Sequence, residues 1–134
     1  MKPTLVDTDI LSLFFRGDPA VVTRFAEYAR EHGSISIAVI TYYEVLSGLR
    51  HRDARRQLEV FQRFVASNRV LPLHEEAAVH AADFYATTRK AGRPVDDIDL
   101  LIAGIAVANG LAVATRNTSH FAMIPGLDVQ DWSV

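Results

Sequence analysis

Acidic residues stand at three places in the sequence where a helix is expected to begin. Asp7 ends the short apolar run Leu5-Val6, Glu44 follows an apolar stretch, and Asp99 lies in the first turn of an apolar helix. The carboxyl ends of parallel strands gather at one edge of a sheet, so we expect these carboxylates to converge there. Oxygen ligands of this kind suit Mg²⁺ or Mn²⁺, and a bound cation could activate water for phosphodiester hydrolysis.

Each of these acids also has a purely structural interpretation. Asp7 or Asp9 could do no more than cap the first helix, where we expect Thr8 at the N-cap. Thr41 followed three residues later by Glu44 has the form of a capping box. Capping is the leading interpretation for Asp7 and for Glu44 when each is taken alone. Only their recurrence at equivalent junctions favours a cation site.

The helix that carries Asp99 gives the strongest signal. Asp96, Asp97 and Asp99 lie on its first turn, and from Leu100 onward the helix is apolar on every side, which predicts burial. Capping by Asp96 and the helix dipole explain one or two of these acids. Three close carboxylates raise one another's pKa, and a nearby cation would remove that cost. Gly104 within the helix predicts close packing against a neighbour.

A polar segment follows the predicted strand Leu111–Ala114. Thr115 and Asn117 would supply neutral oxygens at the end of this strand, and Arg116 could face a phosphate. A polar turn is the commonest role for such a segment. Both interpretations stay open.

Predicted strands and helices alternate along the chain. The expected strands are Leu5–Val6, Ser34–Ile40, Val70–Leu73 and Leu111–Ala114, with Val129 in a last one. The first expected helix follows the Thr8 N-cap and runs to Phe15. The other expected helices are Pro19–His32, Tyr42–Leu49, Arg52–Ala66, Glu75–Lys90 and Asp97–Ala108. The alternation predicts the α/β class, a three-layer α/β/α sandwich around a mostly parallel sheet. Residues 1–134 are long enough for a real core and are expected to form a single domain.

Composition excludes several kinds of site and partner. The chain has no cysteine, which excludes disulfides, zinc–thiolate sites and a thiol nucleophile and fits a cytoplasmic location. No apolar run approaches the ~20 residues of a membrane span, and we see no signal peptide. The net charge of −2 excludes a strongly basic coat, so a nucleic acid would have to be held by a local patch or a metal ion.

A local basic patch is available in the middle of the chain. Its members are Arg50, Arg52, Arg55, Arg56 and Arg63. A solvated helix face is the commoner explanation, and a track for phosphates or a dock for an acidic protein segment are the functional alternatives. The five histidines, His32, His51, His74, His80 and His120, show no paired metal-ligand spacing. Of these, we place only His120 near the expected cleft.

These motifs together resemble the PIN-domain ribonucleases, and most of all the VapC toxins of toxin–antitoxin pairs. The matching stretches, which occur in family-like order and spacing, are Leu5–Leu11, Tyr43–Leu49, Asp99–Ala103, Thr115–Asn117, His120–Phe121, Ile124–Leu127 and Trp132. No single stretch decides the matter, since an isolated Asp-x-Asp is common. The likeness runs over the whole chain.

The resemblance implies Mg²⁺-dependent endonucleolytic cleavage of RNA, with Mn²⁺ as a possible substitute. Asp7, Glu44 and Asp99 fall on the family's acidic positions and would be catalytic metal ligands, with Asp96 as a helper. Asn117 stands where many PIN nucleases have a fourth acid; it keeps an acceptor but removes a charge, which weakens the case for a second metal ion. We expect the substrate-positioning residues to be Thr8, Thr115 and Arg116.

The resemblance also implies a protein partner. This would be a cognate antitoxin of the VapB type, in a homodimer or a hetero-oligomer with the antitoxin. No membrane contact is expected.

Three other kinds of protein remain as alternatives. A receiver-type phosphoacceptor would have adjacent acids after the first strand and a late lysine, but Asp7 and Asp9 are separated and no lysine follows Lys90. A haloacid-dehalogenase-like phosphatase shares Asp7-Thr8-Asp9 but also needs a later lysine. A catalytically inactive PIN-like binding module is the third, and the presence of all three acids at the family positions speaks against it.

Overall fold

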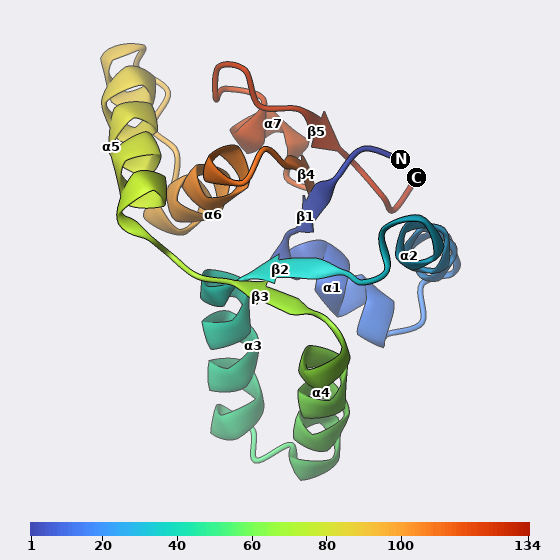
Figure 1. Cartoon of the computed structure of the whole chain (residues 1–134). Coiled ribbons are helices and arrows are strands. Elements are labelled where there is room, and N and C mark those ends of the chain that lie inside the picture. Colours follow the sequence, from blue (N-terminus) through green and yellow to red (C-terminus); the bar gives the residue numbers. More distant parts are fainter.

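The computed structural model describes all 134 residues and arranges them around one central sheet (Figure 1). The strands are β1 (Thr4–Val6), β2 (Ser36–Ala38), β3 (Arg69–Leu71), β4 (Ala112–Ala114) and β5 (Val129–Gln130). The helices are α1 (Thr8–Phe15), α2 (Pro19–His32), α3 (Val39–His51), α4 (Arg55–Ser67), α5 (Glu75–Lys90), α6 (Asp97–Ala108) and α7 (Thr118–Phe121). The alternation of strands and helices expected from the sequence is confirmed.

All neighbouring strands of the sheet are parallel, in the order β3-β2-β1-β4-β5. Leu5 of the central strand β1 lies opposite Ser36 of β2 on one side and Val113 of β4 on the other. Strand β3 is an edge strand and ends at Leu71, because the next residue, Pro72, cannot donate to a sheet ladder.

Two apolar cores lie on the two faces of the sheet and make the three predicted layers. Leu5 of β1, Ala38 of β2 and Val113 of β4 face a core formed with α5, α6 and α7. Val6 faces a second core, which contains Phe25 of α2, Phe61 of α4 and Trp132 near the end of the chain. Neighbouring strand residues therefore point into opposite cores, and all three residues of β1 are buried. A parallel sheet covered by helices on both faces requires such continuous apolar strands.

Helix α6 is packed into the protein as its sequence predicts. Leu100, Ile102 and Ile105 are buried, and α6 packs against α5 (Figure 1). A Cβ atom on Gly104 would lie only 2.4 Å from the carbonyl oxygen of Ala77 on α5. The prediction of close packing at Gly104 is confirmed, since no other side chain fits between these two helices.

The largest error in the predicted elements lies between β2 and α3. We expected a strand over Ser34–Ile40, but β2 contains only Ser36–Ala38 and the helix begins at Val39. Val39 and Ile40 pack against the core on the α5–α6 side of the sheet as the first turn of a helix. A short apolar run cannot by itself distinguish a buried strand from the start of a buried helix.

Other element boundaries differ by a few residues. Helix α4 begins at Arg55 and not at Arg52, and β3 is Arg69–Leu71 and not Val70–Leu73. The polar segment after β4, for which a simple turn was one of two interpretations, contains the one-turn helix α7. None of the helices is long and apolar enough to cross a membrane.

Candidate functional site

The carboxyl ends of four strands place polar residues at one edge of the sheet. Asp7 follows β1, helix α3 with Glu44 follows β2, Thr115 follows β4 and Asp131 follows β5. All these strands are parallel, so their ends lie together as predicted. The chain continues from β1 to β2 on one side of the sheet and later adds β4 on the other side of β1. Open α/β sheets bind their ligands at such a switch point, beyond the carboxyl ends of the strands.

Asp7 is the most deeply buried acid of this edge. One carboxylate oxygen, Oδ1, accepts a hydrogen bond from the backbone N–H of Thr8 at 2.8 Å, and Oδ2 accepts one from the Thr115 hydroxyl at 2.8 Å. Burial first, and then the charges of Asp9 and Asp99, raise the pKa of Asp7 to about 7, although both hydrogen bonds act in the opposite direction. The prediction of Thr8 as the N-cap of α1 is wrong, because Asp7 occupies that position.

Glu44 is joined to the same edge through Thr8. The hydroxyl of Thr8 donates to Glu44 Oε1 at 2.7 Å and lies 3.0 Å from the hydroxyl of Thr41. The predicted capping box of Thr41 and Glu44 is wrong, because the N-cap of α3 is Ala38 and Thr41 lies inside the helix. Helix capping therefore does not explain the presence of Glu44, and a role in the site is the remaining interpretation.

Asp99 is connected to the segment after β4. Its Oδ2 accepts a hydrogen bond from Asn117 Nδ2 at 3.2 Å and lies 3.4 Å from His120 Nδ1. Burial, and less strongly the charge of Asp96, raise the pKa of Asp99, while its contacts with His120 and Asn117 lower it. Asp96 occupies the N-cap of α6 as predicted, but its side chain makes no capping hydrogen bond and is exposed.

His120 and Asn117 share a short contact. His120 Nδ1 lies 2.8 Å from Asn117 Nδ2, closer than it lies to Asp99. The prediction that His120 lies near the cleft is confirmed.

Asp9 was interpreted only as a possible cap, yet it belongs to the acidic edge. Its Oδ2 accepts a hydrogen bond from the backbone N–H of Arg116 at 3.0 Å, and its Oδ1 is buried with no partner. Burial is the main cause that raises the pKa of Asp9, and the charge of Asp131 adds to it. Asp131 was missed, although it directly follows β5 and the rule that identified Asp7 could have found it.

The donor set fits a divalent cation, although it is not a closed cage. No three His, Asp or Glu side chains converge closely enough to hold a metal ion. Mg²⁺ usually keeps several water ligands and binds to one or two carboxylates plus substrate phosphate, so it requires no such cage. The unpartnered buried oxygen of Asp9 and the raised pKa values of Asp7, Asp9 and Asp99 are the costs that a cation would relieve.

Thr115 and Arg116 have different surroundings in the structure. Thr115 is fully buried, and its hydroxyl donates to Asp7 and accepts from the backbone N–H of Asn117 at 2.9 Å. The side chain of Arg116 is exposed and forms no ion pair. Thr115 therefore fixes the Asp7 carboxylate through a buried hydrogen bond, while the exposed guanidinium of Arg116 is available to bind an anion.

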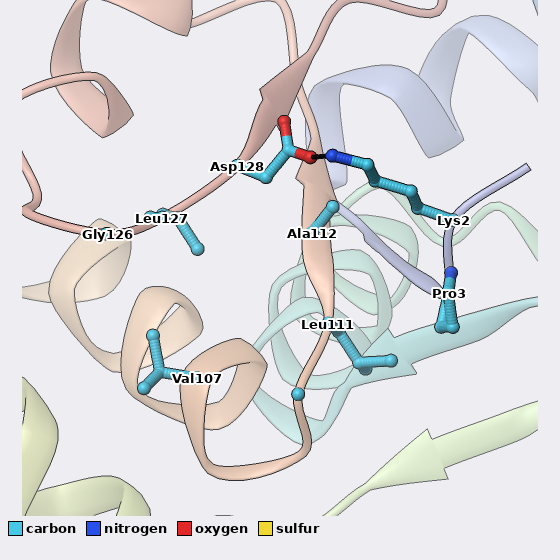
Figure 2. A pocket seen from close by; sticks show the side chains of 9 residues that line it. Lys2, Pro3, Val107, Leu111, Ala112, Gly126, Leu127 and Asp128 are labelled. Atoms are coloured by element: carbon cyan, nitrogen blue, oxygen red, sulfur yellow. Dashed lines mark hydrogen bonds and ion pairs between the residues drawn. The ribbon is translucent and has the colours of Figure 1, made fainter.

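A cavity of about 350 Å³ lies elsewhere, at the opposite ends of the strands (Figure 2). It is bounded mainly by the residues that precede β1, β4 and β5, and Lys2 and Asp128, which form an ion pair, are among its lining residues. The other lining groups are apolar or backbone, so this cavity offers no group for hydrolysis. The acidic edge remains the candidate site.

Comparisons with known proteins identify the family to which this fold belongs. Residues 4–126 match the family described as PIN domain. The chain is 32% identical over 134 residues to the tRNA(fMet)-specific endonuclease VapC of Shigella flexneri, covering 99% of this chain and 100% of that protein. It is 35% identical over 123 residues to ribonuclease VapC10 of Mycobacterium tuberculosis, covering 92% of this chain and 89% of that protein.

A solved structure shows the same arrangement of elements. The crystal structure of DNA-bound VapBC from Salmonella typhimurium contains a chain that superposes on this one with a TM-score of 0.86 at 29% identity. The superposition covers 98% of this chain and 99% of that one.

Proposed function

This chain belongs to the PIN-domain family, and from that premise we propose that it is a metal-dependent endoribonuclease acting as the toxin of a type II toxin–antitoxin pair. The observation that carries the proposal is the position of Asp7, Glu44 and Asp99 at the same carboxyl edge of the sheet, with the pKa values of Asp7 and Asp99 raised. Relatives that match over nearly the whole chain are named VapC endonuclease or ribonuclease, which supports the same activity.

VapC nucleases of this family depend on a metal ion, and we propose Mg²⁺ here, with Mn²⁺ as a substitute. When bound, the ion supplies activation of water and stabilisation of the charge that develops in phosphodiester hydrolysis. Asp7 and Asp99 would be the principal ligands, Asp96 a helper at the exposed side, and Glu44 the residue that holds the attacking water or the ion.

The remaining polar residues act around these acids. Thr115 holds the Asp7 carboxylate through its 2.8 Å hydrogen bond, and Thr8 does so through its backbone N–H. Asn117 holds Asp99 and contributes a neutral polar group in place of a fourth charge. The free guanidinium of Arg116 would contact a phosphate of the RNA beside the scissile bond.

The proposal includes a protein partner and a location. The matching Salmonella structure is described as DNA-bound VapBC, a complex. We propose that this chain pairs with a VapB-like antitoxin that covers the acidic edge, within a homodimer or a hetero-oligomer, in the cytoplasm. A basic side chain of the antitoxin placed among the carboxylates would relieve the same repulsion that a cation relieves. We treat residues 1–134 as a single nuclease domain.

An RNA cleavage assay tests the activity. Purified protein is incubated with total RNA and with initiator tRNA in Mg²⁺, in EDTA and in Mn²⁺, and RNA 5′ ends are sequenced. Site-specific cleavage that needs the cation and is lost in Asp99→Asn supports the proposal. Equal cleavage by wild type and Asp99→Asn, with contaminating nuclease excluded, would refute it. A folded wild type without any cleavage would indicate an inactive binding module.

A further inference from the structure

We infer that Thr41 is a positioning residue for the proposed ribonuclease, and that it acts through the Thr8 hydroxyl on the Glu44 carboxylate. The inference rests on the proposed function, because it assigns a role in the same site. It differs from that proposal in naming a buried residue that touches neither metal nor RNA.

The direction of the hydrogen bonds follows from the donors available. The Thr8 hydroxyl has one hydrogen atom and two oxygen neighbours, Glu44 Oε1 at 2.7 Å and Thr41 Oγ1 at 3.0 Å. An ionised carboxylate can only accept, so the hydrogen of Thr8 points to Glu44. The hydroxyl of Thr41 must then donate to Thr8. The chain of hydrogen bonds therefore runs from Thr41 to Thr8 to Glu44.

Burial makes the Thr41 hydroxyl hard to replace. Thr41 is fully buried, so water has no access to its position. A threonine inside a helix commonly donates to the carbonyl one turn earlier, as Thr88 does to Phe84 at 2.8 Å. Thr41 is the third residue of α3, so the residue one turn earlier belongs to β2 and not to the helix. Its hydrogen-bond partner is Thr8 of α1.

The chain of hydroxyls fixes the distance between two catalytic groups. Thr8 donates its backbone N–H to Asp7 Oδ1 and its hydroxyl to Glu44 Oε1. One residue thus holds carboxylates that lie on different elements of the fold. The hydrogen bond donated by Thr41 limits the rotation of the Thr8 hydroxyl. The Thr8 hydroxyl in turn donates to a carboxylate, and a hydrogen bond to a charged group is stronger than one to a neutral group. Without Thr41, Glu44 would keep its place in the sequence but lose its fixed orientation.

The first test replaces single hydroxyl groups by methyl groups of the same shape. We expect Thr41→Val to lower kcat about tenfold while KM for RNA and the half-saturating Mg²⁺ concentration change less than twofold. Thr41→Ser, which restores the hydroxyl, should recover most of the loss. The matched control is Thr88→Val, another buried helical threonine, which should lose thermal stability and keep kcat. Equal kcat losses in Thr41→Val and Thr88→Val, or no rescue by Ser, would overturn the inference.

A double mutant separates positioning from a general packing effect. If Thr41 acts only through Thr8, Thr41→Val should cause no further loss of kcat in a Thr8→Val background, because the chain is already broken. Additive losses would mean that Thr41 acts by another route.

A readout that does not need activity separates this inference from the proposed function. The buried Thr41 hydroxyl proton should give a slowly exchanging NMR signal with a cross-peak to Thr8, and Thr8→Val should remove that cross-peak. If the signal is present in a protein that cleaves no RNA, the hydroxyl chain stands and the proposed function fails. If RNA is cleaved but the signal is absent and Thr41→Val is fully active, the inference fails alone.

Discussion

The hydroxyl of Thr115 donates a 2.8 Å hydrogen bond to Oδ2 of Asp7 and joins the carboxyl ends of β4 and β1. The two residues are 108 positions apart in the chain, and both are buried. The same hydroxyl accepts from the backbone N–H of Asn117, whose side chain holds Asp99. Two acids of the site are therefore connected through one buried threonine.

Replacing Thr115 should weaken the site through Asp7. The hydrogen bond from Thr115 lowers the pKa of Asp7, so Thr115→Val should raise that pKa above about 7. Protons then compete more strongly with the cation. We expect the half-saturating Mg²⁺ concentration at pH 7 to rise about tenfold, with rescue by Thr115→Ser. The measurement is Mg²⁺-dependent thermal melting, and identical titrations for wild type and Thr115→Val would contradict the role given to this residue.

Asp99→Asn should distinguish a metal ligand from a helix cap by stability. The mutant removes one charge from a repelling cluster, so in EDTA it should melt no lower than wild type. At a hundredfold excess over the dissociation constant, Mg²⁺ should stabilise wild type by about 2.7 kcal/mol and the mutant much less. Asp83→Asn, on the exposed face of α5, is the control and should respond like wild type. Equal Mg²⁺ shifts in wild type and Asp99→Asn, with a lower melting point in EDTA for the mutant, would identify a cap.

The stability of the metal-free protein should depend on pH through Asp7. Its pKa is about 7 in the folded state against 3.8 as the ordinary value, so between these values the folded state holds a proton that the unfolded state releases. The contribution of Asp7 to the free energy of unfolding is therefore greatest below pH 3.8 and falls as the pH rises toward 7. The two values differ by about 3, which corresponds to roughly 4 kcal/mol as an upper limit.

Urea unfolding in EDTA at several pH values measures this effect. Asp9 and Asp99 act in the same direction as Asp7, since their pKa values are also raised. The quantity to compare is the free energy of unfolding of wild type minus that of Asp7→Asn, which should fall between pH 4 and 7. A difference that stays constant or rises over this interval would show that Asp7 titrates normally.

Gly104→Ala should separate α5 from α6. A Cβ at this position would lie 2.4 Å from the Ala77 carbonyl oxygen, and neither backbone can move without moving its helix. We expect a loss of about 1–3 kcal/mol from overpacking, which outweighs the gain in helix propensity of up to ~1 kcal/mol. Gly48→Ala on α3 is the control, because its Cβ would meet only the far end of the Arg52 side chain at 3.4 Å. A mutant Gly104→Ala as stable as wild type in urea would contradict this packing.

The arginines around the α3–α4 turn should contribute to RNA binding. Arg50, Arg52 and Arg56 are exposed and form no ion pair, whereas Arg55 and Arg63 lie near Asp53 and Glu59. Replacing the three free arginines by Gln should raise KM for RNA and leave kcat unchanged. If each contacts one phosphate, the slope of log binding constant against log salt should fall by about 2 for single-stranded RNA. An unchanged KM and salt slope would identify a solvated helix face.

The features that sequence predicted correctly depend on short-range order. Helix α5 occupies Glu75–Lys90 and helix α2 occupies Pro19–His32, both as expected. The burial of α6 and the close approach at Gly104 followed from its all-round apolar character. In these cases the sequence pattern and the interactions that it predicts lie within a few residues of each other. The position of the acids at one edge followed from the prediction of a parallel sheet.

The tertiary structure decided which partners the site residues have. Thr41 and Glu44 look like a local capping box, yet Glu44 is bound by Thr8, 36 positions away, and Asp7 by Thr115. The sequence predicted Thr8 as an N-cap, and it did not reveal that one carboxylate oxygen of Asp9 is buried without a partner. A polar side chain can satisfy its hydrogen bonds either locally or with a distant residue. The packing of α1, α3 and the segment after β4 around the strand ends determines which of these occurs, because burial removes water as the alternative partner.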